Sequence, residues 1–222
     1  MACITNQKAN GSSSTTPVTT TSTINETPSV IEPVAINKDW SKIGNLTDEL
    51  IKIFKKYAKK DNHGGKYDIK WQWLAALAWV ESNWRVNVKN ELGYYGLFQF
   101  LDKNLNDGVK PGTYSLTNPE HQAKVAAKNM SARQKAAKDE GLSEDEAYMY
   151  AGIAHNCGRG GAYFLLDKAS PKTIAQMVHI EKTLPAREFT YDFMASDKKR
   201  KEISEYPYKM RDAYKTICSK YK

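Results

Sequence analysis

The stretch "LAALAWVESNWRV", which runs from Leu74 to Val86, places one carboxylate at the end of an apolar run. On a helix over residues 69–82, Glu81 shares a face with the apolar residues one and two turns earlier. Those residues are Leu74, Leu77 and Ala78. A carboxyl group at the end of such a stripe is partly desolvated, which raises its pKa. The stretch therefore predicts a helix that holds a protonated acid; the alternative is a helix end whose Glu81 turns to water.

Helix signals continue on both sides of this stretch and predict an all-α, or nearly all-α, domain. Thr47 is a typical cap for the preceding helix, and Asp68 for the helix that carries Glu81. Asn118 followed by Pro119 opens a later one. Ser143 and Glu146 have the spacing of a capping box. Three further helices are expected, one opening at Ser170-Pro171, one near 186–199 and one over 208–220.

The first part of the chain has a different composition. Residues 10–35 are rich in Ser and Thr, contain three prolines and carry few large apolar side chains. Such a segment cannot bury enough apolar surface to fold alone. We therefore expect a disordered tail or linker over residues 1–40 and one folded domain over residues 41–222, within the size range of a single domain.

The positive charge of the chain lies in the predicted domain. The chain of 222 residues has a net charge of +8, with a net −1 over residues 1–40 and +9 over the remainder. A basic domain favours a polyanionic partner such as nucleic acid, an anionic membrane or an anionic cell wall. The alternative is that Lys-rich helices are merely soluble. The sequence contains no nucleic-acid motif and its basic residues are scattered, so we expect no nucleic-acid partner.

The cysteine pattern and the hydropathy predict neither a metal nor a membrane span. Cys3, Cys157 and Cys218 match no zinc spacing, and we expect free thiols rather than a pair between the last two. We expect no metal and no cofactor. No apolar run approaches the roughly 18 residues that span a bilayer, and no signal peptide is visible. Cys3 after Ala2 weakly suggests a lipid anchor, so the tail could attach the domain to a membrane or to a larger assembly.

Three motifs occur in order along the domain: Glu81-Ser82 at a helix end, "GLFQ" over 96–99, and "AHNCG" over 154–158. Together they resemble the lytic transglycosylases of the soluble lytic transglycosylase type, which have a lysozyme-like fold related to goose-type lysozymes. That family carries Glu-Ser, then Gly-Leu-Met-Gln, then Ala-Tyr-Asn-Ala-Gly. This chain departs from the pattern at Phe98, His155 and Cys157. The resemblance covers about residues 45–195.

The resemblance implies cleavage of the β-1,4 bond between N-acetylmuramic acid and N-acetylglucosamine in the glycan strands of peptidoglycan. Glu81 would protonate the glycosidic oxygen as a general acid. It would then act as a base toward the C6 hydroxyl of the muramoyl residue, which closes a 1,6-anhydro ring. Ordinary glycosidases need two carboxylates. Here the acetamido group of the substrate would take the second role.

The resemblance also implies residues that contact the sugar. Gln99 and Asn156 suit hydroxyl and acetamide groups, because a side-chain amide both donates and accepts. Ser82 would hydrogen-bond Glu81 or the substrate. Aromatic side chains would wall the cleft, and the candidates are Tyr94, Tyr95, Phe98 and Tyr163.

The last motif of the family, Pro-x-x-Glu-Thr-x-x-Tyr, brings a tyrosine near the catalytic glutamate. "LPAREFTYDFM" resembles this motif loosely and places Tyr191 one residue too close to Glu188. "YPYKMRDAYKT" is a rival segment that offers Tyr208 and Tyr214. We predict Tyr191 as the tyrosine of the site.

Two other functions remain open at this point. If Asp102 or Asp107 faces Glu81 across the cleft, water could be activated and the enzyme would be a hydrolytic muramidase. A non-catalytic wall-binding or structural module of a phage tail or secretion assembly would keep the fold without turnover. His155 is interpreted as a packed core histidine. The expected location is the cell envelope or periplasm, the extracellular space, or a phage virion.

Overall fold

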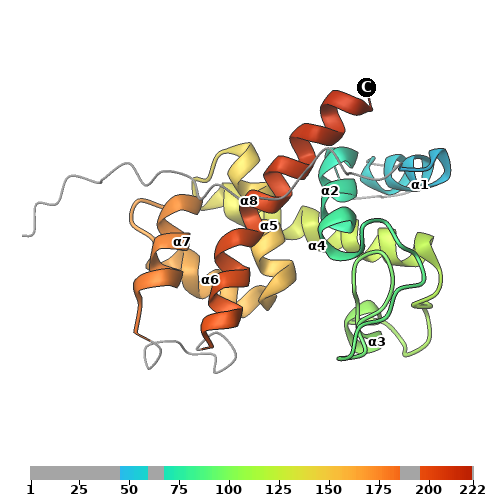
Figure 1. The fold of residues 1–222 in the computed structure, drawn as a ribbon, viewed down its shortest axis with the longest axis horizontal. Helices are drawn as coiled ribbons and strands as arrows, with labels where there is room; N and C mark the ends of the chain where they lie inside the picture. Colours follow the sequence, from blue (N-terminus) through green and yellow to red (C-terminus); the bar gives the residue numbers. More distant parts are fainter. Residues whose placement is uncertain (1–45, 60–67, 186–195, 222) are drawn as a thin grey trace, which may run out of the picture. The chain divides into compact units, whose positions relative to one another are not determined.

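The computed structural model describes residues 46–59, 68–185 and 196–221. Within these ranges the chain is helical and contains no strand, so the prediction of an all-α domain is confirmed. The helices are α1 (Asp48–Ala58), α2 (Trp71–Ser82), α3 (Asp102–Leu105), α4 (Pro119–Asp139), α5 (Glu144–Asn156), α6 (Gly158–Lys168), α7 (Ile174–Thr183) and α8 (Asp197–Lys220) (Figure 1). The predicted tail of residues 1–40 lies outside the described residues.

The caps predicted at Thr47, Asn118 and Ser143 are confirmed, but the one predicted at Asp68 is wrong, because α2 starts after Lys70 and no side chain caps it. The Thr47 side chain accepts a hydrogen bond from the Leu50 backbone N–H at the start of α1. Asn118 caps α4 with Pro119 in its first turn. Ser143 and Glu146 form the expected capping box of α5. Each cap satisfies backbone N–H groups that a helix start would otherwise leave without a partner.

The C-terminal part of the prediction needs correction. Gly158–Lys168 forms a helix, α6, which the sequence did not indicate. The next helix, α7, begins at Ile174 after its cap Thr173, rather than at Ser170-Pro171. The helix predicted over 208–220 begins earlier, at Asp197, and continues through Pro207. Most of the helix predicted near 186–199 lies outside the described residues, and its last residues belong to α8. Proline usually ends a helix, but here α8 packs against α2, α5 and α7, and this contact outweighs one lost backbone hydrogen bond.

The helix that carries Glu81 lies in the centre of the core. Residues 73–79 of α2 are all buried, so the helix is covered on nearly every side rather than along one stripe. It contacts α1, α4 and α8. Trp73 stacks between Tyr148 of α5 and Tyr214 of α8, with ring centroids 5.1 and 4.1 Å away. This packing fixes α2, the helix whose last turn carries Glu81, against α5 and α8.

Gly152 allows α5 and α8 to approach closely. A Cβ atom at this position would overlap Met210 Sδ and would lie 3.2 Å from Cε1 of Tyr206. Both of these residues belong to α8 and are buried. A glycine therefore lets the two helices meet without displacing the buried Met210 side chain.

No helix within the described ranges combines the length and the apolarity that crossing a bilayer requires. Cys157 and Cys218 are both free thiols, as expected.

Glu181 on α7 is a buried carboxyl group away from the motifs. Its side chain is fully buried, and neither carboxylate oxygen forms a hydrogen bond in the described part of the chain. Nε of Arg200 lies 4.0 Å from Oε1 and donates instead to the backbone carbonyl of Glu181. Burial raises the pKa of Glu181 to about 7, against the lowering effect of the Arg200 charge.

This raised pKa predicts a stability loss with rising pH. The folded chain favours the neutral carboxyl of Glu181. Its contribution to the stability of the fold is therefore complete below its ordinary pKa of 4.5, and it is lost as the pH rises through its raised pKa of about 7. Glu181→Gln should therefore be more stable than the unsubstituted chain at pH 8, by on the order of 2 kcal/mol, and similar to it at pH 5. Chemical denaturation at the two pH values measures this.

Glu205→Gln is the matched control, because Glu205 is a carboxylate on α8 that pairs with Lys209. Glu81 titrates in the same pH range and contributes equally to all three proteins. The quantity to compare is therefore the free energy of unfolding of each variant minus that of the unsubstituted chain at the same pH. If the stability of Glu181→Gln changed with pH in the same way as that of the unsubstituted chain, Glu181 would not have a raised pKa in the folded protein.

Candidate active site

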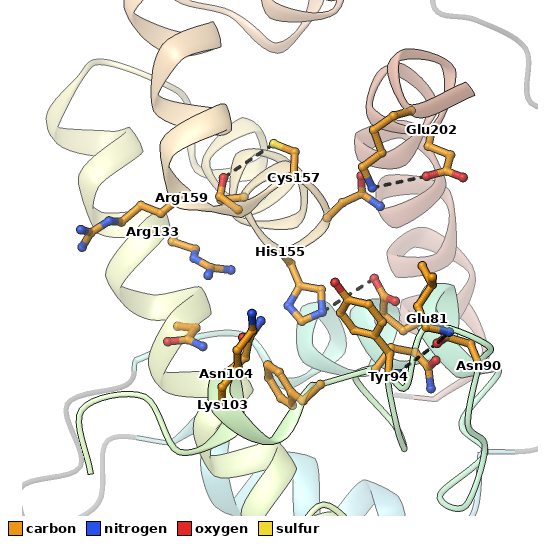
Figure 2. A pocket seen from close by; sticks show the side chains of 18 of the residues that line it. Glu81, Asn90, Tyr94, Lys103, Asn104, Arg133, His155, Cys157, Arg159 and Glu202 are labelled. Carbon is orange, nitrogen blue, oxygen red and sulfur yellow. Dashed lines mark hydrogen bonds and ion pairs between the residues drawn. The ribbon is translucent and has the colours of Figure 1, made fainter. Parts of the chain in front are cut away.

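A cleft of about 1170 Å³ contains Glu81. Its lining comes from the end of α2, the segment between α2 and α4, α4 itself, the junction of α5 and α6, and the first turns of α8 (Figure 2). Side-chain amides are frequent in this lining, and they belong to Asn90, Gln99, Asn104, Asn129 and Asn156. Amides that both donate and accept suit a ligand rich in hydroxyl and acetamide groups.

Glu81 is held by a tyrosine from the other end of the chain. Its side chain is 16% exposed, and Oε1 accepts a hydrogen bond from the hydroxyl of Tyr206 on α8. No hydrogen bond to Oε2 is formed within the described residues. Because Oε1 is the acceptor for Tyr206, the proton of the neutral acid belongs on Oε2. The carboxyl group thus keeps one oxygen for positioning and one for proton transfer.

The surroundings of Glu81 keep it protonated near neutral pH. Burial raises its pKa to about 7. The hydrogen bond from Tyr206 and the charge of Lys199 lower the pKa, and the charge of Glu202 raises it. A carboxyl group with a pKa near the working pH is suited to giving and taking a proton in turn.

His155 lies next to Glu81 but remains neutral. Nε2 lies 2.9 Å from the Phe98 carbonyl oxygen and 3.7 Å from Glu81 Oε1. A carbonyl oxygen only accepts, so Nε2 carries the proton and Nδ1 is the free acceptor. Burial and the charge of Arg133 lower the pKa of His155 to about 4, against a raising effect of the Phe98 hydrogen bond. The close approach to Glu81 is therefore no ion pair at neutral pH.

The "GLFQ" motif forms a tight turn against α2 and α4. Gly96 has φ of +77°, and a Cβ there would overlap the side-chain amide of Gln122. Leu97 O lies 2.9 Å from Ser82 Oγ, which lies equally close to Ala78 O. Gln99 has φ of +46° and donates from Nε2 to Gly96 O at 2.9 Å. These contacts fix the turn beside Glu81 and direct Gln99 to the cleft.

The structure brings several predicted site residues to one cleft. Glu81, Gln99 and Asn156 all line it, as does Tyr94. Asn156 Oδ1 is buried and has no hydrogen-bond partner in the described part of the chain. A buried acceptor without a partner is costly, and a donor on a bound ligand would satisfy it.

Other predicted residues do not line the cleft. Ser82 is buried with its hydroxyl directed at backbone carbonyls. Phe98 is a core residue that packs against Phe54 and Phe100. The Tyr95 hydroxyl donates to Asn87 Oδ1 at 3.2 Å. Tyr163 is 57% exposed and lies outside the cleft lining.

Tyr191, the predicted tyrosine of the last motif, lies outside the described residues. Among the described residues, Tyr206 is the tyrosine that contacts Glu81. A sequence signal for it exists: Glu202 and Tyr206 are four residues apart, which is the spacing of Glu and Tyr in the family motif. The rival segment "YPYKMRDAYKT" begins at Tyr206, so it supplies the contact, but through neither Tyr208 nor Tyr214.

The candidates for a second carboxylate are Asp107 and Glu202. Both line the cleft, whereas Asp102 is absent from its lining and accepts a hydrogen bond from Asn106. Glu202 Oε2 pairs with Lys199 Nζ at 3.3 Å. Within the described residues, no group of three or more His, Cys, Asp or Glu side chains is arranged to hold a metal ion.

Residues 59–175 match the family described as the transglycosylase SLT domain. This range contains Glu81, Gln99 and Asn156 and ends before Tyr206. A region of 116 residues is also 31% identical to the membrane-bound lytic murein transglycosylase F of Salmonella arizonae. That alignment covers 52% of this chain but only 20% of the relative. The resemblance inferred from the three motifs is confirmed, and the chain belongs to the transglycosylase SLT domain family.

Proposed function

We propose that the chain is a lytic transglycosylase that cleaves the N-acetylmuramic acid to N-acetylglucosamine bond of peptidoglycan. The observation that carries the proposal is Glu81, a largely buried acid with a pKa of about 7, in a cleft lined by side-chain amides. Membership of the SLT domain family supports the substrate class. The name of the Salmonella relative also points to murein.

In the proposed first step, Glu81 Oε2 gives its proton to the glycosidic oxygen and the bond to C1 of the muramoyl residue breaks. The acetamido group of the substrate stabilises the positive centre. Tyr206 then favours the new carboxylate, because its hydrogen bond lowers the pKa of Glu81. In the second step this carboxylate removes the proton of the C6 hydroxyl, whose oxygen bonds to C1 and closes the 1,6-anhydro ring. Glu81 ends protonated.

The remaining predicted residues take supporting roles in this proposal. Gln99 and Asn156 would bind sugar hydroxyl and acetamide groups, and Tyr94 would form part of the cleft wall. Ser82 would act through the turn that it holds rather than through the substrate. We place the activity in the cell envelope, outside the cell or on a virion, where peptidoglycan is accessible.

A test of the acid is Glu81→Gln, which keeps the shape of the side chain but cannot give a proton. Release of soluble fragments from purified peptidoglycan should fall at least about a hundredfold. Helical circular dichroism should be maintained and the thermal midpoint should not fall, because the variant removes a buried carboxyl without leaving a cavity. Glu205→Gln, on α8 and outside the cleft lining, serves as the control and should retain activity. Undiminished lysis by Glu81→Gln would overturn the assignment.

A second test concerns the products. Mass spectrometry of the released muropeptides should show 1,6-anhydro ends, because the C6 hydroxyl of the substrate replaces water as the nucleophile. Asp107 and Glu202 both line the cleft and could activate water instead. Products heavier by one water would mean a hydrolytic muramidase.

The third test uses pH. Because Glu81 must be protonated to act as an acid, the rate should fall as the pH rises above about 7. Tyr206→Phe removes a hydrogen bond that lowers this pKa, so the fall should move to higher pH. The maximal rate should also decrease, roughly tenfold or more, because the carboxylate loses a charge-assisted hydrogen bond.

Tyr208→Phe is the matched control, since Tyr208 is a buried tyrosine of the same helix that does not line the cleft. Its pH profile should coincide with that of the unsubstituted chain. An unchanged profile in Tyr206→Phe would show that the Tyr206 hydroxyl does not tune Glu81.

A further inference from the structure

Five basic residues line the cleft against three acidic ones, namely Lys103, Arg133, Arg159, Lys198 and Lys199 against Glu81, Asp107 and Glu202. Lys199 is paired with Glu202. Arg133 of α4 and Arg159 at the start of α6 also line the cleft, and they lie on the same side of it in Figure 2. Neither arginine forms an ion pair within the described residues. This side of the cleft therefore carries two positive charges without a described counter-ion.

Arg133 is the better defined of the two. Its pKa is lowered, first by burial and also by the charge of Arg159. Groups that would raise the pKa if they were ionised are Cys157, Tyr150 and Tyr206. Burial raises the pKa of the first two to about 12 and that of Tyr206 well above its usual value. All three are therefore neutral at pH 7, and they do not compensate the guanidinium.

A guanidinium removed from water without an anion is unfavourable, and a second one beside it adds repulsion. A bound anion would relieve both. Arginine is suited to this because its planar fork binds carboxylates through two parallel hydrogen bonds. Asn129, one turn before Arg133 on α4, also lines the cleft and adds an amide donor.

The anion would lie close to the reacting sugar. His155 lies between Arg133 and Glu81 in Figure 2, with its Nε2 3.7 Å from Glu81 Oε1, and the charge of Arg133 is near enough to lower its pKa. The sugar that reacts at Glu81 under the proposed function is the muramoyl residue. That residue carries the lactyl-linked stem peptide, which is the substituent with free carboxylates.

We propose that Arg133 and Arg159 form a binding site for the carboxylates of the stem peptide and so select glycan strands that carry peptides. This inference rests on the proposed function, because it assigns the arginines a part of the same substrate. It makes Arg133 a residue that determines substrate preference while Glu81 performs the chemistry.

The test is a binding measurement in the Glu81→Gln background, so that turnover does not interfere. The ligands are soluble disaccharide-peptide fragments, free of phosphate-bearing polymers, and the same fragments with their peptide carboxylates converted to neutral amides. Calorimetry should show roughly tenfold to hundredfold weaker binding of the amidated ligand. Arg133→Gln should weaken binding of the native ligand by a similar factor and leave binding of the amidated ligand unchanged.

Two further variants sharpen the outcome. Arg133→Lys keeps the charge without the fork and should bind the native ligand with intermediate affinity. Lys135→Gln removes one charge from the same helix at a residue that pairs with Asp139 outside the cleft, and it should bind like the unsubstituted background. Thermal unfolding of each variant checks that the fold is retained.

Equal affinity for the two ligands would overturn this inference and leave the proposed function intact. So would a loss in Arg133→Gln that is the same for both ligands, because Arg133 would then act on the fold or the sugar. Failure of the background protein to bind either ligand would instead overturn the proposed substrate, and this inference with it.

Discussion

The hydrogen bond from Tyr206 to Glu81 joins two helices whose contacting residues are 125 positions apart. It forms only because α8 lies against α2, with Tyr214 stacked on Trp73, and approaches α5 closely at Gly152. A largely buried carboxyl is tolerated when it is neutral or hydrogen-bonded. The packing of α8 supplies both conditions, since it shields Glu81 from most of the solvent and brings the hydroxyl that positions it. The state of the acid is thus a property of the helix packing.

Glu81 and the two arginines lie on different sides of the cleft (Figure 2). Glu81 and His155 are both kept largely uncharged by burial, the first by a raised pKa and the second by a lowered one. Arg133 and Arg159 lie on the other side with no described counter-ion. An acid keeps its proton at neutral pH where its own charge is unfavourable, while an anionic substituent is attracted to the arginines. The Glu81 side of the cleft is therefore suited to the bond that receives the proton, and the arginine side to an anionic substituent of the same ligand.

The motifs of the sequence contain residues of two kinds that a linear pattern does not separate. Gln99 and Asn156 face the cleft, whereas Ser82 and Phe98 face the interior and hold the turn in place. Neighbouring residues of the "GLFQ" turn point in different directions because Gly96 and Gln99 have positive φ angles. Helix periodicity does not describe such a turn, and so the direction of each side chain could not be predicted from it.

The sequence by itself determined the helical class, the caps of three helices and the placement of Glu81 at the end of an apolar segment, because these depend on neighbours within a few residues. Only the tertiary structure decided that α8 continues through Pro207, that Tyr206 contacts Glu81 and that Arg133 faces the cleft. Those features depend on which helices lie side by side. Their free energy comes from contacts between distant segments, which local propensity does not contain.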